Sequence, residues 1–152
     1  MIAESLICLA LNVYHEAKNQ SFIGQVAVAQ VVMNRVEDSR YPNNVCDVVK
    51  QGLTYKWKPT LPIKNRCQFS WYCDGKKDII WATYMDGEVI TENMTAWRDS
   101  IHVALFLING DYSMDPTDGA VFYYNPHIAN PSWGAVYSET AMIGNHRFMK
   151  DK

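Results

Sequence analysis

The amino-acid sequence predicts an α+β fold in which a helical core comes first and a small β part follows. Three segments, residues 2–17, 24–37 and 95–109, carry apolar residues at the 3.6-residue period of a helix. Toward the end, residues 119–124 and 143–148 are short apolar and aromatic stretches between turns rich in Pro and Asn, which indicates strands. No repeat, linker or low-complexity segment divides the chain, so we expect one domain.

The helix predicted over residues 2–17 has one apolar face and places Glu16 at the edge of that face. On a helical wheel Glu16 lies about 80° from the centre of the face, whereas His15 lies on the opposite, solvent side. A carboxyl at such a margin is partly removed from water, which raises its pKa and suits it to act as a general acid. The apolar face consists of Ile2, Leu6, Leu9, Ala10, Val13 and Ala17.

The pair His15-Glu16 also matches the first two residues of the zinc motif His-Glu-x-x-His. In that motif two imidazoles one helical turn apart hold the metal. Asn19 occupies the position of the second histidine, and the other histidines show no metal-ligand spacing. The sequence therefore predicts no metal site and no cofactor. The ordinary alternative for Glu16 is a surface glutamate near a helix C-terminus, although the helix dipole disfavours a negative charge there.

The second predicted helix, residues 24–37, is apolar almost all round, which is typical of a buried helix. One narrow polar face remains, formed by Gln30, Asn34 and Glu37. A short helix is expected over residues 45–51.

Two segments contain polar and aromatic side chains that can contact a ligand. After a loop predicted at residues 53–62, residues 67–72 alternate like a strand, with Gln68 and Ser70 on one face. These two side chains can donate hydrogen bonds to a hydroxyl or an acetamide, and an ordinary edge strand is the alternative. Tyr123 and Tyr124 face opposite sides of a later strand, so that one can line a groove while the other packs.

Composition and charge exclude several classes of protein. The net charge is −2 with no basic patch, so nucleic acid is not an expected partner. No stretch approaches the ~20 apolar residues that span a bilayer, and the segment Met1–Ser5 lacks the basic start of a secretory signal. The nine Tyr, five Trp and five Phe are mostly expected in the core, but aromatic faces also stack on sugar rings.

The four cysteines show no Cys-x-x-Cys spacing, which argues against a zinc knuckle or a redox motif. Cys8 falls on the first helix and is expected to be a small core residue. Cys67 and Cys73 can meet across a turn, but without a signal segment we expect reduced thiols.

Short motifs follow one another in a specific order along nearly the whole chain. They are Tyr14-His15-Glu16-Ala17, Asn34-Arg35-Val36, Tyr41-Pro42, Cys67-Gln68-Phe69-Ser70-Trp71, Asp115-Pro116-Thr117-Asp118-Gly119-Ala120, Tyr123-Tyr124-Asn125-Pro126 and Ile143-Gly144-Asn145-His146-Arg147-Phe148. Each motif alone is weak. In this order and spacing they resemble the cell-wall hydrolase family of the SleB/CwlJ type, which includes spore-cortex lytic enzymes and phage lysins.

The resemblance implies a lysozyme-like fold, with a substrate groove between the helical core and a small antiparallel β part. It implies that residues 1–152 form a single cell-wall hydrolase catalytic domain acting on peptidoglycan, with Glu16 as the one essential carboxyl. Spore members carry a signal, whereas the segment Met1–Ser5 does not resemble one. We therefore expect a phage or prophage endolysin that is made in the cytoplasm and reaches the wall after release or export. The residues expected to bind the glycan are Gln68, Ser70, Trp71, Tyr123, Tyr124, Asn125 and His146.

The implied reaction is that of a lytic transglycosylase, which cuts between N-acetylmuramic acid and N-acetylglucosamine and leaves 1,6-anhydro-muramoyl ends. Most glycosidases instead use two carboxylates. Candidates for a second one are Asp74, Asp115, Asp118 and Glu139, but each lies in a turn-like context where an acidic residue has a structural role. The reaction that the resemblance implies needs only one carboxyl, so we expect Glu16 to act alone, as acid and then as base. We expect a monomer that binds glycan strands and does not insert into a membrane.

Three alternatives remain open at this point. A hydrolytic muramidase would use a second carboxylate not yet identified, and a non-catalytic peptidoglycan-binding module would use Glu16 only as a hydrogen-bonding group. An amidase or peptidase that cuts the stem peptide would need a metal triad or a Cys-His pair, for which Cys67, Cys73 and His146 are the available residues.

Overall fold

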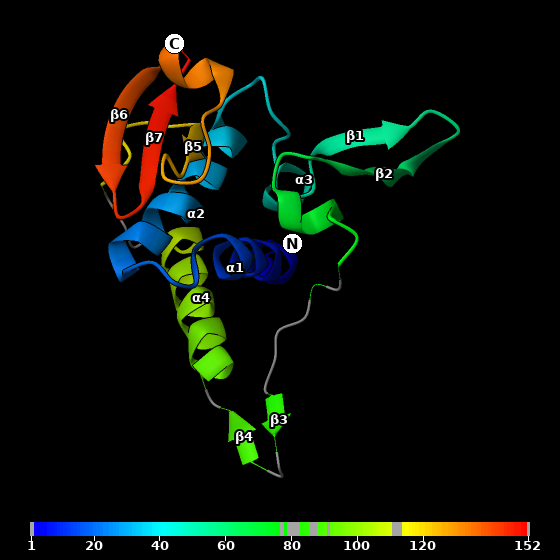
Figure 1. Cartoon of the computed structure of the whole chain (residues 1–152), viewed down its shortest axis with the longest axis vertical. Helices are drawn as coiled ribbons and strands as arrows, with labels where there is room; N and C mark the ends of the chain where they lie inside the picture. The colour runs from blue at the N-terminus through cyan, green and yellow to red at the C-terminus, as the bar shows by residue number, and fades with distance from the viewer. Residues whose placement is uncertain are drawn as a thin grey trace.

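The structure is a computed structural model that describes residues 2–76, 78, 83–85, 88–90, 92–110 and 114–151. It contains helices and short antiparallel strands, as the sequence predicts (Figure 1). The helices are α1 (Ile2–Ala17), α2 (Phe22–Glu37), α3 (Val45–Val49) and α4 (Glu92–Ile108), with two short 3₁₀ helices, η1 (Ser70–Cys73) and η2 (Ser132–Ala135). The strands are β1 (Gly52–Tyr55), β2 (Lys58–Cys67), β3 (Thr83–Met85), β4 (Glu88–Ile90), β5 (Phe122–Tyr124), β6 (Ser138–Ile143) and β7 (His146–Lys150).

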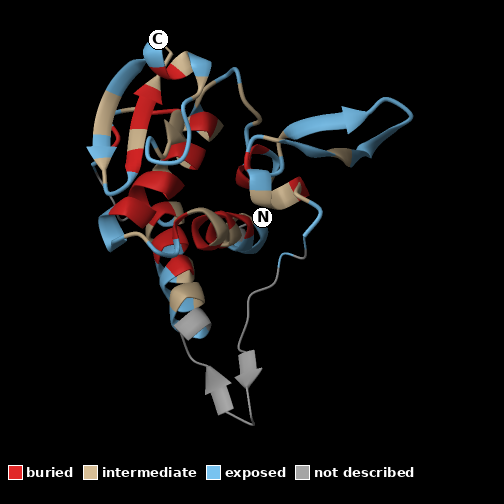
Figure 2. Cartoon of the chain, in the orientation of Figure 1, coloured by how far each residue is buried: buried red, intermediate tan, exposed pale blue. Residues whose placement is uncertain are grey.

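The helical core forms where the sequence places its apolar faces. Helix α1 packs against α2, α3 and α4, and the residues of these helices that form the core are buried (Figure 2). Helix α2 is buried along most of its length, and its first turn is capped by Ser21, whose hydroxyl accepts a hydrogen bond from the Gly24 N–H. None of the described helices is long and apolar enough to span a lipid bilayer.

The C-terminal sheet has the order β5–β7–β6, and all of its strands pair antiparallel. Phe148 of β7 is completely buried, and it packs with Val28 and Val31 of α2. The strand predicted at residues 143–148 is wrong in one respect: a turn with Gly144 at φ +58° separates β6 from β7 within that range. The pair Gly144-Asn145 forms this turn, and Ile143 and His146 on either side of it are paired across the two strands.

The region between α3 and η1 differs from the prediction. Residues 53–62, predicted as a loop, belong to the hairpin β1–β2, and the predicted strand at 67–72 is instead the end of β2 followed by η1. The strands close so tightly that a Cβ on Gly52 would lie 2.8 Å from the Cα of Cys67. Most side chains of the hairpin are exposed on both faces, so the sequence carries no alternation between buried and exposed positions.

All four cysteines are paired, which corrects the expectation of reduced thiols. One disulfide, Cys8–Cys46, joins α1 to α3, and the other, Cys67–Cys73, joins the end of β2 to η1. Cys8 is a buried core residue as predicted. The thiol expectation rested on the N-terminal sequence alone, which carries no information on which cysteines lie close together in the fold.

Candidate active site

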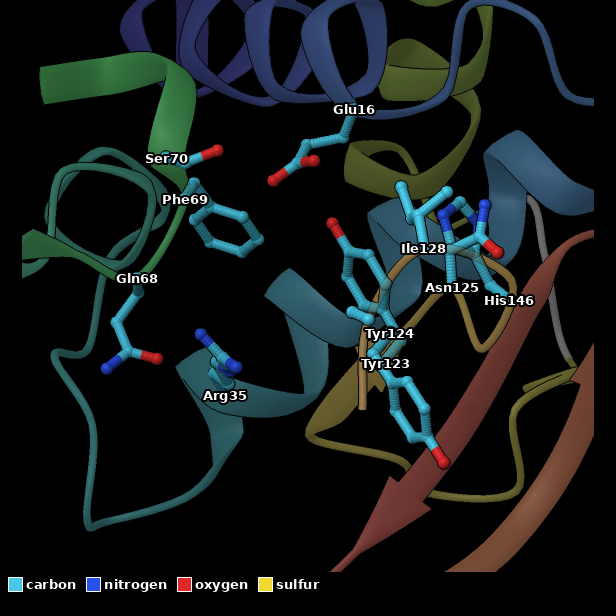
Figure 3. A pocket seen from close by; sticks show the side chains of 11 residues that line it. Glu16, Arg35, Gln68, Phe69, Ser70, Tyr123, Tyr124, Asn125, Ile128 and His146 are labelled. Carbon is cyan, nitrogen blue, oxygen red and sulfur yellow. The ribbon is translucent and has the colours of Figure 1, made fainter. Parts of the chain in front are cut away.

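Glu16 lies in the last turn of α1, and its carboxyl points into a cavity of about 320 Å³ (Figure 3). The side chain is half-buried, at the edge of the apolar face of the helix, as the helical wheel predicts. The cavity lies between the helices and the β5–β7–β6 sheet, with the segment after β2 as its third side. Its lining is formed by Glu16, Arg35, Gln68, Phe69, Ser70, Tyr123, Tyr124, Asn125, Ile128, Ala129 and His146.

Burial raises the pKa of the Glu16 carboxyl from 4.5 to about 7. Removal from water is the largest cause, and the hydroxyl of Tyr123 and the positive charge of Arg35 act in the opposite direction. A group with this pKa is present in both protonation states near neutral pH. Glu16 can therefore give up a proton and take one back under the same conditions.

Tyr123 and Tyr124 of β5 face different partners, as neighbouring residues of a strand do. The hydroxyl of Tyr123 is buried next to Glu16, and burial together with the Glu16 charge raises its pKa well above the usual value. It lies close enough to influence Glu16, yet it completes no hydrogen bond of good geometry within the described part of the chain. The Tyr124 hydroxyl instead accepts a 2.6 Å hydrogen bond from Arg147, which is also paired with Glu139.

Arg35 was not predicted as a site residue. Its guanidinium is almost completely buried, and the Nε–H donates a 2.7 Å hydrogen bond to the carbonyl of Val121. The Nη1 group is buried and has no hydrogen-bond partner among the described residues. The guanidinium carbon lies 5.2–5.5 Å from the centres of three aromatic rings, those of Tyr41, Phe69 and Phe122.

The sequence does contain a signal for Arg35. A cation within a helix that is apolar almost all round is unusual, because a buried charge is costly unless other groups compensate for it. Arg35 does not share the spacing of the polar face, which consists of Gln30, Asn34 and Glu37, so that face does not predict it. Three further residues that line the cavity were not predicted: Phe69, Ile128 and Ala129. Nothing in the sequence distinguishes their apolar side chains from those of the core.

Gln68 and Ser70 lie on the cavity wall opposite the sheet, although they are not on a strand. The Gln68 N–H donates a 2.9 Å hydrogen bond to the carbonyl of Gln51, which fixes the chain as it leaves β2. The side chains of both residues are exposed, whereas Phe69 between them is buried. These two residues therefore present polar groups to the cavity while Phe69 anchors the wall to the core.

Trp71 does not contribute to the cavity surface in the described structure. Its ring stacks on His15 at a centroid distance of 4.7 Å, and its Nε1–H donates a 2.9 Å hydrogen bond to Asn12. The prediction that His15 faces solvent is therefore wrong, because η1 brings Trp71 over it and leaves His15 half-buried. Burial also lowers the pKa of His15.

Asn125 and His146 complete the side of the cavity formed by the sheet. The side-chain oxygen of Asn125 accepts a 2.9 Å hydrogen bond from the His127 N–H, so Asn125 begins a turn that carries Ile128 to the cavity rim. His146 is buried, and burial lowers the pKa of its imidazole, which keeps it neutral near pH 7. Its Nδ1 atom has no hydrogen-bond partner within the described ranges.

The candidates for a second carboxylate are not among the residues that line the cavity, and three of them have structural partners. Asp115 accepts hydrogen bonds from Thr117 and from the Gly119 N–H, and so closes its own turn. Asp74 accepts one from the Lys76 N–H. Of the described residues that line the cavity, Glu16 is the single carboxylic acid; the remaining candidates are Asp118, in a turn at φ +53°, and Glu139, exposed and paired with Arg147.

The residues available for peptidase chemistry do not form such a site. Cys67 and Cys73 are bonded to each other, so neither sulfur is a thiol that His146 could activate. Within the described ranges, no three His, Cys, Asp or Glu side chains are grouped as metal ligands would be.

The sequence profile of a family described as Cell Wall Hydrolase matches residues 19–149, beginning three residues after Glu16. The chain is 29% identical over 143 residues to a spore cortex-lytic enzyme of Bacillus cereus, covering 93% of this chain and 42% of that protein. It is 27% identical over 140 residues to the spore cortex-lytic enzyme of Bacillus subtilis, covering 92% of this chain and 35% of the relative. The chain thus spans less than half the length of these relatives.

Solved structures are similar over almost the whole chain. The catalytic domain of the Bacillus cereus SleB protein has a TM-score of 0.64 at 28% identity, covering 97% of this chain and 91% of that domain. The catalytic domain of the germination-specific lytic transglycosylase SleB from Bacillus anthracis has a TM-score of 0.61 at 29% identity, with coverages of 96% and 93%. These matches confirm the predicted α+β, lysozyme-like fold class.

Proposed function

Because this chain belongs to the cell wall hydrolase family, we propose that it cuts the glycan strands of peptidoglycan as a lytic transglycosylase. The observation that carries the proposal is the Glu16 carboxyl, the single carboxylic acid among the described residues that line the cavity. Its pKa is about 7, and polar and aromatic side chains surround it. The relatives named as cortex-lytic enzymes and the named lytic transglycosylase support the same substrate and reaction.

In the first step, protonated Glu16 gives its proton to the oxygen that links N-acetylmuramic acid to N-acetylglucosamine. The bond from the muramoyl C1 to that oxygen breaks, and positive charge develops on the sugar ring. The acetamide of the substrate is available to stabilise that charge. Burial favours the protonated form of Glu16 that this step requires, since it raises the pKa.

In the second step, ionised Glu16 takes the proton from the muramoyl 6-hydroxyl while the oxygen of that hydroxyl bonds to C1. The product is a 1,6-anhydro ring, no water is consumed, and Glu16 is again protonated. Arg35 and Tyr123 both stabilise the ionised carboxyl, because each lowers its pKa. No second carboxylate is needed, which agrees with the lining of the cavity.

The residues around Glu16 suit the binding of a glycan. Gln68, Ser70 and Asn125 present groups that donate or accept hydrogen bonds with sugar hydroxyls and acetamides. The Nδ1 atom of His146, which has no hydrogen-bond partner among the described residues, is a further site for an acetamide. The exposed side chain of Ile128 provides apolar surface for a sugar ring.

Mass spectrometry of digested peptidoglycan tests the proposal. Anhydro-muramoyl ends are expected from the wild-type chain and none from Glu16→Gln. Reducing muramic ends would indicate a hydrolytic muramidase with a second carboxylate. Cosedimentation with peptidoglycan without release of soluble fragments would indicate a non-catalytic binding module, and both results would contradict the transglycosylase.

We also propose that the chain acts outside the cytoplasm, reaching the wall after release or export in the manner of a phage lysin. Two disulfides support an oxidising location, because reduced thiols prevail in the cytoplasm. Counting free thiols in the protein recovered from the wall of its host, under denaturing conditions, tests this point. Four alkylated cysteines would contradict it.

A further inference from the structure

The hairpin β1–β2 projects from one side of the molecule, with η1 as its main neighbour (Figure 1). A two-stranded hairpin alone is only marginally stable in water. This one is joined at its base by the Cys67–Cys73 disulfide and by the pairing of Gly52 with Cys67. The body of the molecule therefore leaves most of the surface of this hairpin free for contact with something else.

Most residues of the hairpin are exposed (Figure 2). Several of them have large apolar side chains. Trp57, in the turn between the strands, is 74% exposed, and Leu53 is 60% exposed. The ring of Tyr55 lies beside that of Trp57, with a centroid distance of 5.5 Å. Exposed aromatic side chains that gather in one place are typical of a binding surface.

The hairpin is also basic, although the whole chain has a net charge of −2. Residues 52–67 contain Lys56, Lys58, Lys64 and Arg66 and no acidic residue. Within the described structure, none of these four cations forms an ion pair with a carboxylate. The surface therefore suits an anionic partner that also offers faces on which aromatic rings can stack.

The hairpin is continuous with the candidate active site. β2 ends at Cys67, and the next residues, Gln68 to Ser70, line the cavity that holds Glu16. A polymer that fills the cavity and continues past Gln68 would meet the hairpin next. Its charge is also complementary: the peptide stems of peptidoglycan carry carboxylates, and its sugars offer faces for aromatic rings.

We propose that the hairpin β1–β2 is an arm that holds the peptidoglycan strand beyond the cavity. Trp57 and Tyr55 stack on sugar rings, and the lysines bind carboxylates of the peptide stems. This inference rests on the proposed function for the identity of the polymer. It assigns binding of long strands to the hairpin and bond cleavage to Glu16.

Cosedimentation with purified peptidoglycan sacculi tests the arm in a chain that carries Glu16→Gln, so that the strands stay intact. Adding Trp57→Ala, or Lys56→Gln together with Lys58→Gln, should weaken binding about tenfold, as the loss of a central contact does. The lysine variant should also bind with a weaker dependence on salt concentration. Val136→Ala and Arg98→Gln remove an exposed apolar side chain and an exposed cation elsewhere, and should bind like the parent.

A second measurement uses the intact Glu16. The hairpin variants should have a KM about tenfold higher on sacculi and an unchanged rate on a short glycan fragment without peptide stems, which fills only the cavity. Parent-like binding by all hairpin variants would overturn the arm. Hairpin-dependent binding to phosphatidylglycerol vesicles, with sacculus binding unchanged, would overturn it in favour of a lipid surface. Because binding is measured in a chain that does not cut, its outcome is independent of whether the wild-type chain releases fragments.

Discussion

The cavity has two walls that are stabilised differently. The helical wall is made by buried helices, and the hairpin wall is made by the exposed segment, Gln68 to Ser70, that follows the hairpin. Glu16 and Arg35 come from α1 and α2, whose facing side chains form the core of the protein. Gln68 and Ser70 are exposed and depend on Phe69 and the Cys67–Cys73 disulfide for their position. Burial changes the pKa of both Glu16 and Arg35, whereas the opposite wall contributes neutral groups to the cavity.

This difference indicates that the raised pKa of Glu16 and the binding of substrate come from separate parts of the molecule. A carboxyl with a raised pKa needs a low-polarity surrounding, which only the packed helices provide. A long polymer needs an open surface, which the helices do not provide and the hairpin does. Substitutions in the helical wall should therefore change kcat and pH dependence, and substitutions in the hairpin wall should change KM.

The largest expected effect is that of Glu16→Gln. The amide keeps the shape of the side chain but donates no proton to the glycosidic oxygen, so kcat should fall by about 10³-fold or more. Release of soluble muropeptides from sacculi measures the loss. Glu4→Gln, an exposed change on the same helix, is the matched control and should keep activity near the wild-type value. Lysis by Glu16→Gln at the wild-type rate would show that the helical wall does not provide the proton donor.

The two disulfides separate stability from substrate binding. Cys8–Cys46 spans 38 residues and should stabilise the fold by about 4 kcal/mol, compared with about 2 kcal/mol for Cys67–Cys73, which spans six. Cys8→Ala/Cys46→Ala should thus lower the melting temperature more, without raising KM. Cys67→Ala/Cys73→Ala should lower it less but raise KM on sacculi. Equal effects of both pairs on KM would contradict a separate role for the hairpin wall.

The raised pKa of Glu16 also has a measurable cost in stability. The folded chain holds a proton on Glu16 up to about pH 7, while the unfolded chain releases it near pH 4.5, so stability falls as pH rises between these values. At pH 8 the Glu16→Gln variant should be more stable than the wild type, by at most about 3 kcal/mol. Below pH 4.5 the difference should disappear. Urea unfolding at pH 4 and pH 8 measures it, and a constant difference would contradict the raised pKa.

Arg35→Met tests the second charge of the helical wall. The cation lowers the pKa of Glu16, so its loss should raise that pKa and move the high-pH fall of kcat/KM to higher pH. The hydrogen bond to the Val121 carbonyl is lost as well, so a lower melting temperature is also expected. A pH profile measured beside Arg98→Gln, an exposed cation on α4, separates the local charge from the overall charge. An unmoved profile would show that Arg35 acts through packing alone.

The helical wall was predicted more accurately than the hairpin wall, and the reason is physical. Helix α1 has the bounds Ile2–Ala17 given by its periodicity, because one of its faces is buried and the other is not. The burial margin of Glu16 followed from that same pattern. The hairpin is exposed on both faces, so its sequence contains no period to detect.

Contacts between distant segments were the second limit of prediction. Asn34, expected on a polar face of α2, indeed bonds to a polar partner, Asp115, but that partner lies 81 residues away. Arg35 was missed because its compensation comes from Val121 and three aromatic rings, which only the folded chain brings together. The disulfide Cys8–Cys46 has the same origin.

The smallest expected effect compares two neighbouring tyrosines of β5. Tyr123→Phe removes a buried hydroxyl that lowers the pKa of Glu16 and completes no hydrogen bond in the described residues. Stability should therefore be kept or slightly increased, while kcat falls a few-fold, since ionised Glu16 loses a favourable neighbour. The pH profile of kcat/KM, compared with thermal unfolding, measures both effects.

Tyr124→Phe is the matched control, because it removes the same hydroxyl from the adjacent position. It breaks the 2.6 Å hydrogen bond from Arg147, so stability should fall by about 1 kcal/mol while the pH profile keeps its position. If both variants moved the profile equally, the hydroxyl facing Glu16 would have no special role. If only Tyr123→Phe moves the pH profile, the influence on Glu16 is specific to the face of β5 turned toward the helices. Tyr123 of the sheet then acts on Glu16 together with the residues of the helical wall.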